Sequence, residues 1–230
     1  LNYYKKLLDD TWNKAYKNSE RENLGWFEND LSESFNLIQK CKLSKDSRIF
    51  NAGAGESLLI KKLQKFGYSN ILINDISDTA IKKLKNSLDN HNGLHFIIED
   101  LTNPTKLLNI EKVDLWHDRA VLHFFIKKNQ QKTYFNLIKS KIRSGGYVIF
   151  SEFALDGAKK CCGLEILNYD NEMFKNNLGD DFQLIDTFNY FPDCSRNNYP
   201  HIRFFTYNSV LQLFSKYNFK IIKNFSLNFF

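Results

Sequence analysis

The sequence predicts an α/β fold in which a mostly parallel sheet carries helices on both faces. Short apolar runs alternate with helical stretches from residue 46 onward, and several runs end in glycine or in an acid. Each run is almost continuously apolar, which is typical of strands buried on both faces of a parallel sheet. The length of 230 residues suits a single domain, residues 1–230. We divide it into a helical N-terminal segment, residues 1–45, and a core, residues 46–230.

The helices are indicated by apolar periodicity and by the residues that begin or end them. The N-terminal segment has an apolar stripe in LSESFNLIQKCKL. In the core, Gly67 closes one helix, and Ser77 can cap the next. A third helix ends before Gly145 and Gly146. The expected core helices are SLLIKKLQKFG (57–67), SDTAIKKLKNSLDN (77–90) and KNQQKTYFNLIKSKI (128–142).

Five core strands lie between these helices. In a parallel sheet of this kind, ligands bind outside the carboxyl ends of the strands, so the residues at those ends are the candidates for a site. The expected strands are RIFNAG (48–53), NILINDI (70–76), LHFIIED (94–100), VDLWHD (113–118) and YVIFSEF (147–153).

The end of the chain admits two interpretations. FQLIDTFNYF (182–191) is expected to be a strand, and HIRFFTYNSV (201–210) could be its antiparallel partner. Alternatively, NSVLQLFSKYNFKIIKNFSL (208–227) is a helix followed by a strand. The pattern does not choose between them.

Composition excludes several classes of protein. The net charge of +6 comes without a basic block, which argues against nucleic-acid binding, although it can steer an acidic partner. No apolar run is long enough to span a membrane, and the N-terminus lacks the apolar core of a secretory signal. The four cysteines form no disulfide framework and no zinc spacing. We therefore expect a cytoplasmic protein with free thiols and no metal site.

The turn NAGAGESLL, residues 51–59, follows the first strand and opens a helix. Gly53 and Gly55 allow a tight turn and a close approach of the backbone to a ligand. The dinucleotide fingerprint requires a third glycine where this chain has Leu58, so the turn fits a nucleoside better than a pyrophosphate. Asp75 ends the second strand and suits the hydroxyls of a ribose. Asp100 ends the third and can accept from an adenine amino group, unless it only caps the following segment.

Taken together, these motifs and SGGYVIFSEF resemble class I S-adenosylmethionine-dependent methyltransferases over residues 8–190. The resemblance implies an enzyme with a doubly wound, Rossmann-like sheet of seven strands, or six if the chain stops early, and a helical lid at the N-terminus. It implies S-adenosylmethionine as methyl donor and S-adenosylhomocysteine as product. Asn51 departs from the family, which usually has Asp or Glu there. The implied cofactor contacts are Trp26, Asn51, Ala52, Gly53, Gly55, Asp75, Ile76, Asp100, Leu101 and His117.

The stretch DLWHDRAVLHFF, residues 114–125, places ionisable side chains in an apolar context. It resembles a WHDRAV-type subgroup of small bacterial methyltransferases and, more loosely, thiopurine-type S-methyltransferases and lysine methyltransferases with a D-K-G-T run. His117 or His123 could act as a base, and Asp118 could orient a histidine or Arg119. A guanidinium at Arg119 would favour a thiolate. The structural alternatives are a buried Asp118–Arg119 ion pair and a core His123; in a helix, Arg119 and His123 would share a face.

These residues lead to a prediction of methyl transfer to a small molecule, preferably a small thiol or sulfide. Arg119, His123 and Cys161 are the candidate contacts to that substrate, and Trp26 could offer a cation-π face to the sulfonium. The first alternative is a protein lysine N-methyltransferase with a broad acidic rim. The second is a protein that binds the cofactor without catalysis, which Asn51 leaves open.

Overall fold

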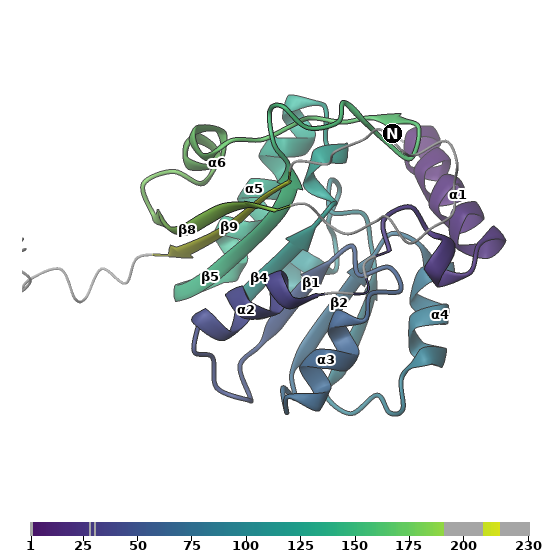
Figure 1. Ribbon diagram of the computed structural model, residues 1–230, viewed down its shortest axis with the longest axis horizontal. Coiled ribbons are helices and arrows are strands. Elements are labelled where there is room, and N and C mark those ends of the chain that lie inside the picture. Colours follow the sequence, from purple (N-terminus) through teal and green to yellow (C-terminus); the bar gives the residue numbers. More distant parts are fainter. Residues whose placement is uncertain (1, 28, 30, 191–208, 217–230) are drawn as a thin grey trace, which may run out of the picture.

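The computed structural model describes residues 2–27, 29, 31–190 and 209–216 (Figure 1). Its helices are α1 (Asn2–Asn18), α2 (Ser32–Lys40), α3 (Leu59–Lys65), α4 (Asp78–Ser87), α5 (Lys128–Lys141) and α6 (Asn171–Leu178). Its strands are β1 (Ile49–Ala52), β2 (Ile71–Asp75), β3 (Leu94–Ile98), β4 (Val113–Arg119), β5 (Ile142–Phe153), β6 (Lys160–Cys161), β7 (Leu164–Glu165), β8 (Phe182–Tyr190) and β9 (Ser209–Lys216).

The main sheet of the described residues has the strand order β3-β2-β1-β4-β5-β9-β8. The strands β1 to β5 are parallel to one another, while β9 runs antiparallel to β5 and β8. The order reverses between β1 and β4, and this is the point where open α/β sheets bind their ligands. The prediction of a doubly wound α/β sheet with five parallel strands is therefore confirmed.

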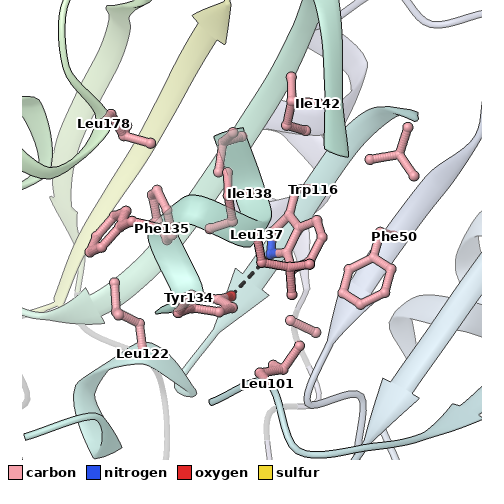
Figure 2. Packing of buried hydrophobic residues seen from close by; sticks show 14 of the residues in the cluster. Phe50, Leu101, Trp116, Leu122, Tyr134, Phe135, Leu137, Ile138, Ile142 and Leu178 are labelled. Atoms are coloured by element: carbon pink, nitrogen blue, oxygen red, sulfur yellow. Dashed lines mark hydrogen bonds between the residues drawn. The ribbon is translucent and has the colours of Figure 1, made fainter. Parts of the chain in front are cut away.

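Alternation of side chains along the strands divides the core into two layers. Ile49 and Leu115 pack with residues of α2, α3 and α4 on one face of the sheet. Phe50 and Trp116 pack with residues of α5 and α6 on the other face, where their rings are stacked 3.9 Å apart (Figure 2). Because both faces are covered, strands such as β1 and β2 are buried at every position, which explains their continuous apolar runs.

The N-terminal segment packs on α4 in a small cluster of its own. α1 lies beside α4 (Figure 1), and Tyr16 is buried together with Leu24 and Ala80. The Asn13 carboxamide oxygen accepts a hydrogen bond of 2.6 Å from the Ser77 hydroxyl, and Ser77 itself caps α4 by accepting from the Ala80 amide. The segment is thus attached beside the carboxyl ends of β1 and β2.

Strand β8 forms where FQLIDTFNYF predicts one. The adjacent β9 is an extended strand over SVLQLFSK, so the alternative of a helix beginning at residue 208 is wrong. Pairing of β9 with β5 on one side and β8 on the other supplies backbone hydrogen bonds that override the local helical periodicity. Residues 201–208 of the predicted partner strand lie outside the described residues. Among the described helices, none is both long and apolar enough to cross a membrane.

Candidate cofactor and acceptor site

The glycine turn after β1 forms one wall of a cavity at the carboxyl ends of the parallel strands. Gly53 and Gly55 both have left-handed backbones, with φ of 54° and 52°. A Cβ on Gly53 would lie 2.1 Å from Val121 Cγ2, and a Cβ on Gly55 would lie 2.5 Å from the Tyr16 hydroxyl. Both positions therefore require glycine, for conformation and for space.

Asp75 joins this turn to the start of α4. One carboxylate oxygen accepts from the Gly55 amide at 2.7 Å, and the other accepts from the Ser77 amide at 2.8 Å. Burial raises the pKa of Asp75 to about 6, although these amide hydrogen bonds oppose the rise. Asp75 and Ile76 both line the cavity. Asp75 therefore shapes the turn in addition to any contact with a ligand.

Two neighbouring acids after β3 have different positions. Glu99 binds the following segment, because its carboxylate accepts from the backbone amides of Thr105 and Leu107. Asp100 accepts from the Thr102 amide and hydroxyl through Oδ1, and it lines the cavity together with Leu101. Most of the capping is thus done by Glu99, a residue that the sequence analysis did not single out.

Asn51 and His117 face each other across β1 and β4 and line the cavity. His117 Nδ1 lies 2.7 Å from Asn51 Oδ1, and because a carboxamide oxygen only accepts, Nδ1 carries the proton. Burial, and then the Arg119 charge, lowers the pKa of His117 to about 3, so the ring is neutral. Its Nε2 therefore presents a lone pair, and this buried atom has no hydrogen-bond partner in the structure.

Aromatic side chains from the N-terminal segment and from the loop after β4 form another wall of the cavity. Trp12 packs edge-to-face on Trp26 and on Phe124, with ring centroids 5.4 and 5.1 Å apart. Tyr16 packs on Trp26 in the same way, at 5.5 Å. Both guanidinium NH₂ groups of Arg119 lie 3.4 Å from the Trp26 carbonyl oxygen. Arg119 thus contacts the N-terminal segment as well as the cavity.

Asp118 lies on the opposite face of β4, below the cavity floor, and belongs to a buried polar network. Tyr134 donates to its Oδ2 at 2.6 Å, and the Trp116 indole donates to Tyr134 at 3.0 Å (Figure 2). Burial and the neighbouring Glu152 raise the pKa of Asp118 well above its usual value. No Asp118–Arg119 ion pair is needed to explain this carboxyl group, because Tyr134 and the Val121 amide already bind it.

Glu152 on β5 connects this network to His123. Its carboxylate accepts from the Leu122 and His123 amides, and Oε2 lies 2.5 Å from His123 Nδ1. Burial raises the pKa of Glu152 to about 8. His123 is completely buried, with an unpartnered Nε2, and it does not line the cavity. An acid inside the apolar strand YVIFSEF was a signal of this network that the sequence analysis did not use.

The chain leaves β4 through a turn rather than a helix. Ala120 has a left-handed backbone, with φ of 63°, and a short 3₁₀ turn covers Leu122–Phe124. A helix would have placed Arg119 and His123 on one face, but the chain forms this turn instead: Arg119 reaches the cavity, whereas His123 points toward Glu152. A strained residue at this position is typical of functional loops.

The structure brings most of the predicted site residues to one cavity. Asp118 and His123 are not among its lining residues, so neither contacts a ligand directly there. No group of three or more potential metal ligands occurs within the described part of the chain. The predicted residues that line the cavity are Trp26, Asn51, Ala52, Gly53, Gly55, Asp75, Ile76, Asp100, Leu101, His117, Arg119 and Cys161.

Comparison with known proteins agrees with this geometry. The family described as "Methyltransferase domain" matches residues 50–150, which include the glycine turn and the strand ends of the cavity. Residues 50–150 of this chain are therefore similar to a methyltransferase domain. The fold of a solved S-adenosylmethionine-dependent methyltransferase from Anabaena variabilis covers 93% of this chain and 95% of its own, with a TM-score of 0.72 and 12% identity.

Two curated relatives match parts of this chain. Malonyl-[acyl-carrier protein] O-methyltransferase 2 of Ilyobacter polytropus is 31% identical over 136 residues, which are 59% of this chain and 46% of the relative. EEF1A lysine methyltransferase 2 of Mus musculus is 30% identical over 87 residues, 36% of each protein. The chain thus spans less than half the length of either relative.

The cavity residues fit S-adenosylmethionine. At Gly53 and Gly55 there is no room for a Cβ, and the absence of side chains allows the backbone to approach the ligand closely. Asp75 and Asp100 are acceptors for hydroxyl and amino donors, and the lone pair of His117 Nε2 is an acceptor that the protein leaves unused. S-adenosylmethionine supplies donors of both kinds, together with a sulfonium that needs no anion site.

Proposed function

We propose that this protein transfers the methyl group of S-adenosylmethionine to a small-molecule acceptor, preferably a small thiol or sulfide. The observation that carries the proposal is one cavity in which the glycine turn, Asp75 and Asp100 meet the loop after β4. When bound, the cofactor supplies an electrophilic methyl group on a sulfonium. The chain's own contribution is to bind, orient and enclose the two reactants, which for an in-line displacement provides much of the rate.

Asp75 and Ile76 would hold the ribose, and Asp100 and Leu101 the adenine. Asn51, Ala52, Gly53 and Gly55 would line the methionine part. The family usually has a carboxylate where this chain has Asn51, and here the neutral Asn51–His117 pair offers the Nε2 lone pair to the cofactor ammonium. A neutral acceptor beside a cation is weaker than a carboxylate but still forms a charge-assisted hydrogen bond.

The N-terminal segment would act as a lid over the reactants. Trp12, Tyr16 and Trp26 line the cavity and pack on one another and on Phe124 of the loop after β4. An aromatic face near a sulfonium stabilises the cation. The bond from Arg119 to the Trp26 carbonyl holds the lid to the acceptor side. Closure of the segment would exclude water from the transfer.

Beside the loop after β4, the cavity is lined by the Arg119 guanidinium, the thiols of Cys161 and Cys162, and aromatic rings. Arg119 would favour an anionic nucleophile, such as a thiolate or a carboxylate, and would repel a lysine ammonium. The relative from Ilyobacter acts by name on an oxygen nucleophile, so carboxylic acids belong in any acceptor screen. The aromatic wall favours a small acceptor over a protein segment.

Protein lysine methylation is the second candidate, supported by the name of the mouse relative. It would require an acidic entrance for the lysine, whereas Glu56, Glu99 and Asp75 of the cavity already bind chain partners. These acids do not form a free acidic rim, which places lysine methylation behind the small-molecule proposal.

Labelled S-adenosylmethionine tests these alternatives in one experiment. The protein would be incubated with small thiols including sulfide, with small carboxylic acids and, separately, with whole-cell protein extract. We expect label in a small or volatile thioether that decreases strongly with Arg119→Ala at unchanged cofactor affinity. Label in a methyl ester would show that the acceptor atom is a carboxylate oxygen. Label in a protein band would favour the lysine alternative. Tight cofactor binding without any labelled product would favour a binding-only protein.

A further inference from the structure

A pair of adjacent cysteines lies at the edge of the cavity, in the small hairpin formed by β6 and β7. Cys161 Sγ and Cys162 Sγ are 3.6 Å apart, close enough to interact and too far apart to be a disulfide. Both residues line the same cavity as the glycine turn. Cys161 is partly exposed and Cys162 is exposed, so a solute can reach both thiols.

The backbone holds the two thiols side by side. Cys162 and Gly163 have φ of 54° and 78°, as in a two-residue type I′ hairpin, and the flanking Cys161 and Leu164 are paired. The first position of such a turn favours Asn, Asp or Gly, because the left-handed conformation is unfavourable for other residues. A cysteine at this strained position places a second thiol next to the first.

Hydrogen bonds on the following segment keep the hairpin in place. The Leu167 amide donates to the His123 carbonyl at 2.8 Å, and the Tyr169 amide donates to the Phe153 carbonyl at 2.9 Å. The Asn168 carboxamide donates to the Ala154 carbonyl at 2.6 Å. The thiols are therefore positioned before any ligand arrives, which lowers the entropic cost of binding through both.

The two sulfurs differ in acidity. A hydrogen bond from Cys161 lowers the pKa of Cys162, while the same bond and burial raise the pKa of Cys161. The neighbouring His123 opposes that rise in the pKa of Cys161. Of the two, Cys162 is therefore the more acidic thiol, and the thiolate is the form of a cysteine that attacks first.

We propose that Cys161 and Cys162 form a chelating site for trivalent organoarsenicals at the acceptor side of the cavity. Starting from both thiols and the hydrated arsenical R–As(OH)₂, each sulfur replaces one hydroxyl on arsenic: two As–S bonds form, two S–H and two As–O bonds break, and each hydroxyl leaves as water with one thiol proton. Arsenic remains trivalent, so no oxidant or reductant takes part. Zinc fits less well, because it requires about four ligands and no third ligand accompanies the pair in the described residues.

Phenylarsine oxide is a suitable probe, because its hydrate has one trivalent arsenic with two exchangeable oxygens. The full chain would first be reduced, then mixed with the probe and excess glutathione, and arsenic retained after desalting would be measured by native mass spectrometry. We expect one arsenic per chain, released by a competing dithiol. Cys161→Ser and Cys162→Ser should each weaken binding by about 100-fold, because a second thiol on the same scaffold contributes through a high effective concentration.

Cys41→Ser is the matched control, since Cys41 is a buried thiol at the end of α2, and it should bind like the parent chain. Cys194 lies outside the described residues, and Cys194→Ser should also bind normally. Undiminished binding by either hairpin variant, loss of binding by Cys194→Ser, or no arsenic on the fully reduced chain would each overturn the assignment. The arsenical site goes beyond the proposed methyl transfer. Arsenic binding requires neither the cofactor nor turnover, so either proposal can be wrong while the other holds.

Discussion

His117 and Asp118 are neighbours in the chain, but they lie on opposite faces of the sheet and in opposite environments. His117 reaches the cavity, shares a hydrogen bond with Asn51 and leaves one ring nitrogen unused. Asp118 points toward α5, where Tyr134 and the Val121 amide bind its two oxygens. An unsatisfied buried acceptor in a cavity indicates a ligand, whereas a satisfied one indicates a scaffold.

The same contrast separates the two histidines. His117 and His123 each have an unpartnered Nε2, but only His117 lines the cavity. His123 is held by Glu152 beneath the cysteine hairpin. We therefore expect substitutions in the buried network of Asp118, Glu152 and His123 to lower mainly the stability of the fold. Substitutions at the cavity should lower mainly the affinity for ligands.

The largest effect is expected from Glu152→Ala. This change leaves the Leu122 and His123 amides and His123 Nδ1 without their buried acceptor, which should lower the free energy of unfolding by about 3–5 kcal/mol. Urea denaturation measures it, with the exposed Glu165→Ala as control. A loss as small as that of the control would show that Glu152 is not a structural element of the network.

His117→Ala should reduce affinity for S-adenosylmethionine while leaving the fold intact. Removal of an acceptor for the cofactor ammonium is expected to cost about 1.5–3 kcal/mol, roughly 10- to 150-fold in Kd by titration calorimetry. 5′-Methylthioadenosine lacks the amino-acid group, so its affinity should be almost unchanged. An equal loss for both ligands would mean that His117 acts through packing rather than through the ammonium.

Gly53→Ala should weaken cofactor binding by at least about tenfold, or about 1.4 kcal/mol. The new Cβ would meet Val121 Cγ2 at 2.1 Å and displace the loop after β4. Gly145→Ala is the control, because Gly145 also has a positive φ of 78° but has open space around it. If both variants lose the same affinity, backbone strain and not the close approach is responsible.

The two regions should also give the stability a pH dependence of opposite sign. Burial lowers the pKa of His117 to about 3, so between about 3 and 6.5 the unfolded chain binds more protons and stability rises with pH. Burial raises the pKa of Glu152 to about 8, so between about 4.5 and 8 the folded chain binds more protons and stability falls with pH. Above pH 6.5, only the Glu152 titration of these two still changes the stability, and the stability falls.

We expect the free energy of unfolding to fall from pH 6.5 to pH 8, and Glu152→Gln to reduce this fall. His117→Gln should instead reduce the rise below pH 6.5 and leave the upper range unchanged. Urea titrations at several pH values provide both slopes. If the free energy of unfolding of Glu152→Gln still falls with pH above 6.5, another group in the network is responsible for the titration.

Sequence reasoning identified the elements of the sheet because strands buried on both faces need continuous apolar runs, and the helices between them need a periodic stripe. It also located the cavity residues, since the glycine turn, Asp75 and Asp100 come directly at the ends of strands. It did not identify β9, whose segment has a helical pattern, because strand pairing with β5 and β8 decides that conformation.

The sequence by itself determined the fold class, the glycine turn and the strand-end residues, because these depend on patterns within a few neighbouring positions. Only the tertiary structure decided which ionisable residues of DLWHDRAVLHFF reach the cavity. That outcome depends on the β4 pleat, on the left-handed turn at Ala120 and on Glu152, which lies 29 residues from His123. Long-range partners of this kind leave no local pattern, so the division between ligand-binding and supporting residues appears only when β4 and β5 lie side by side.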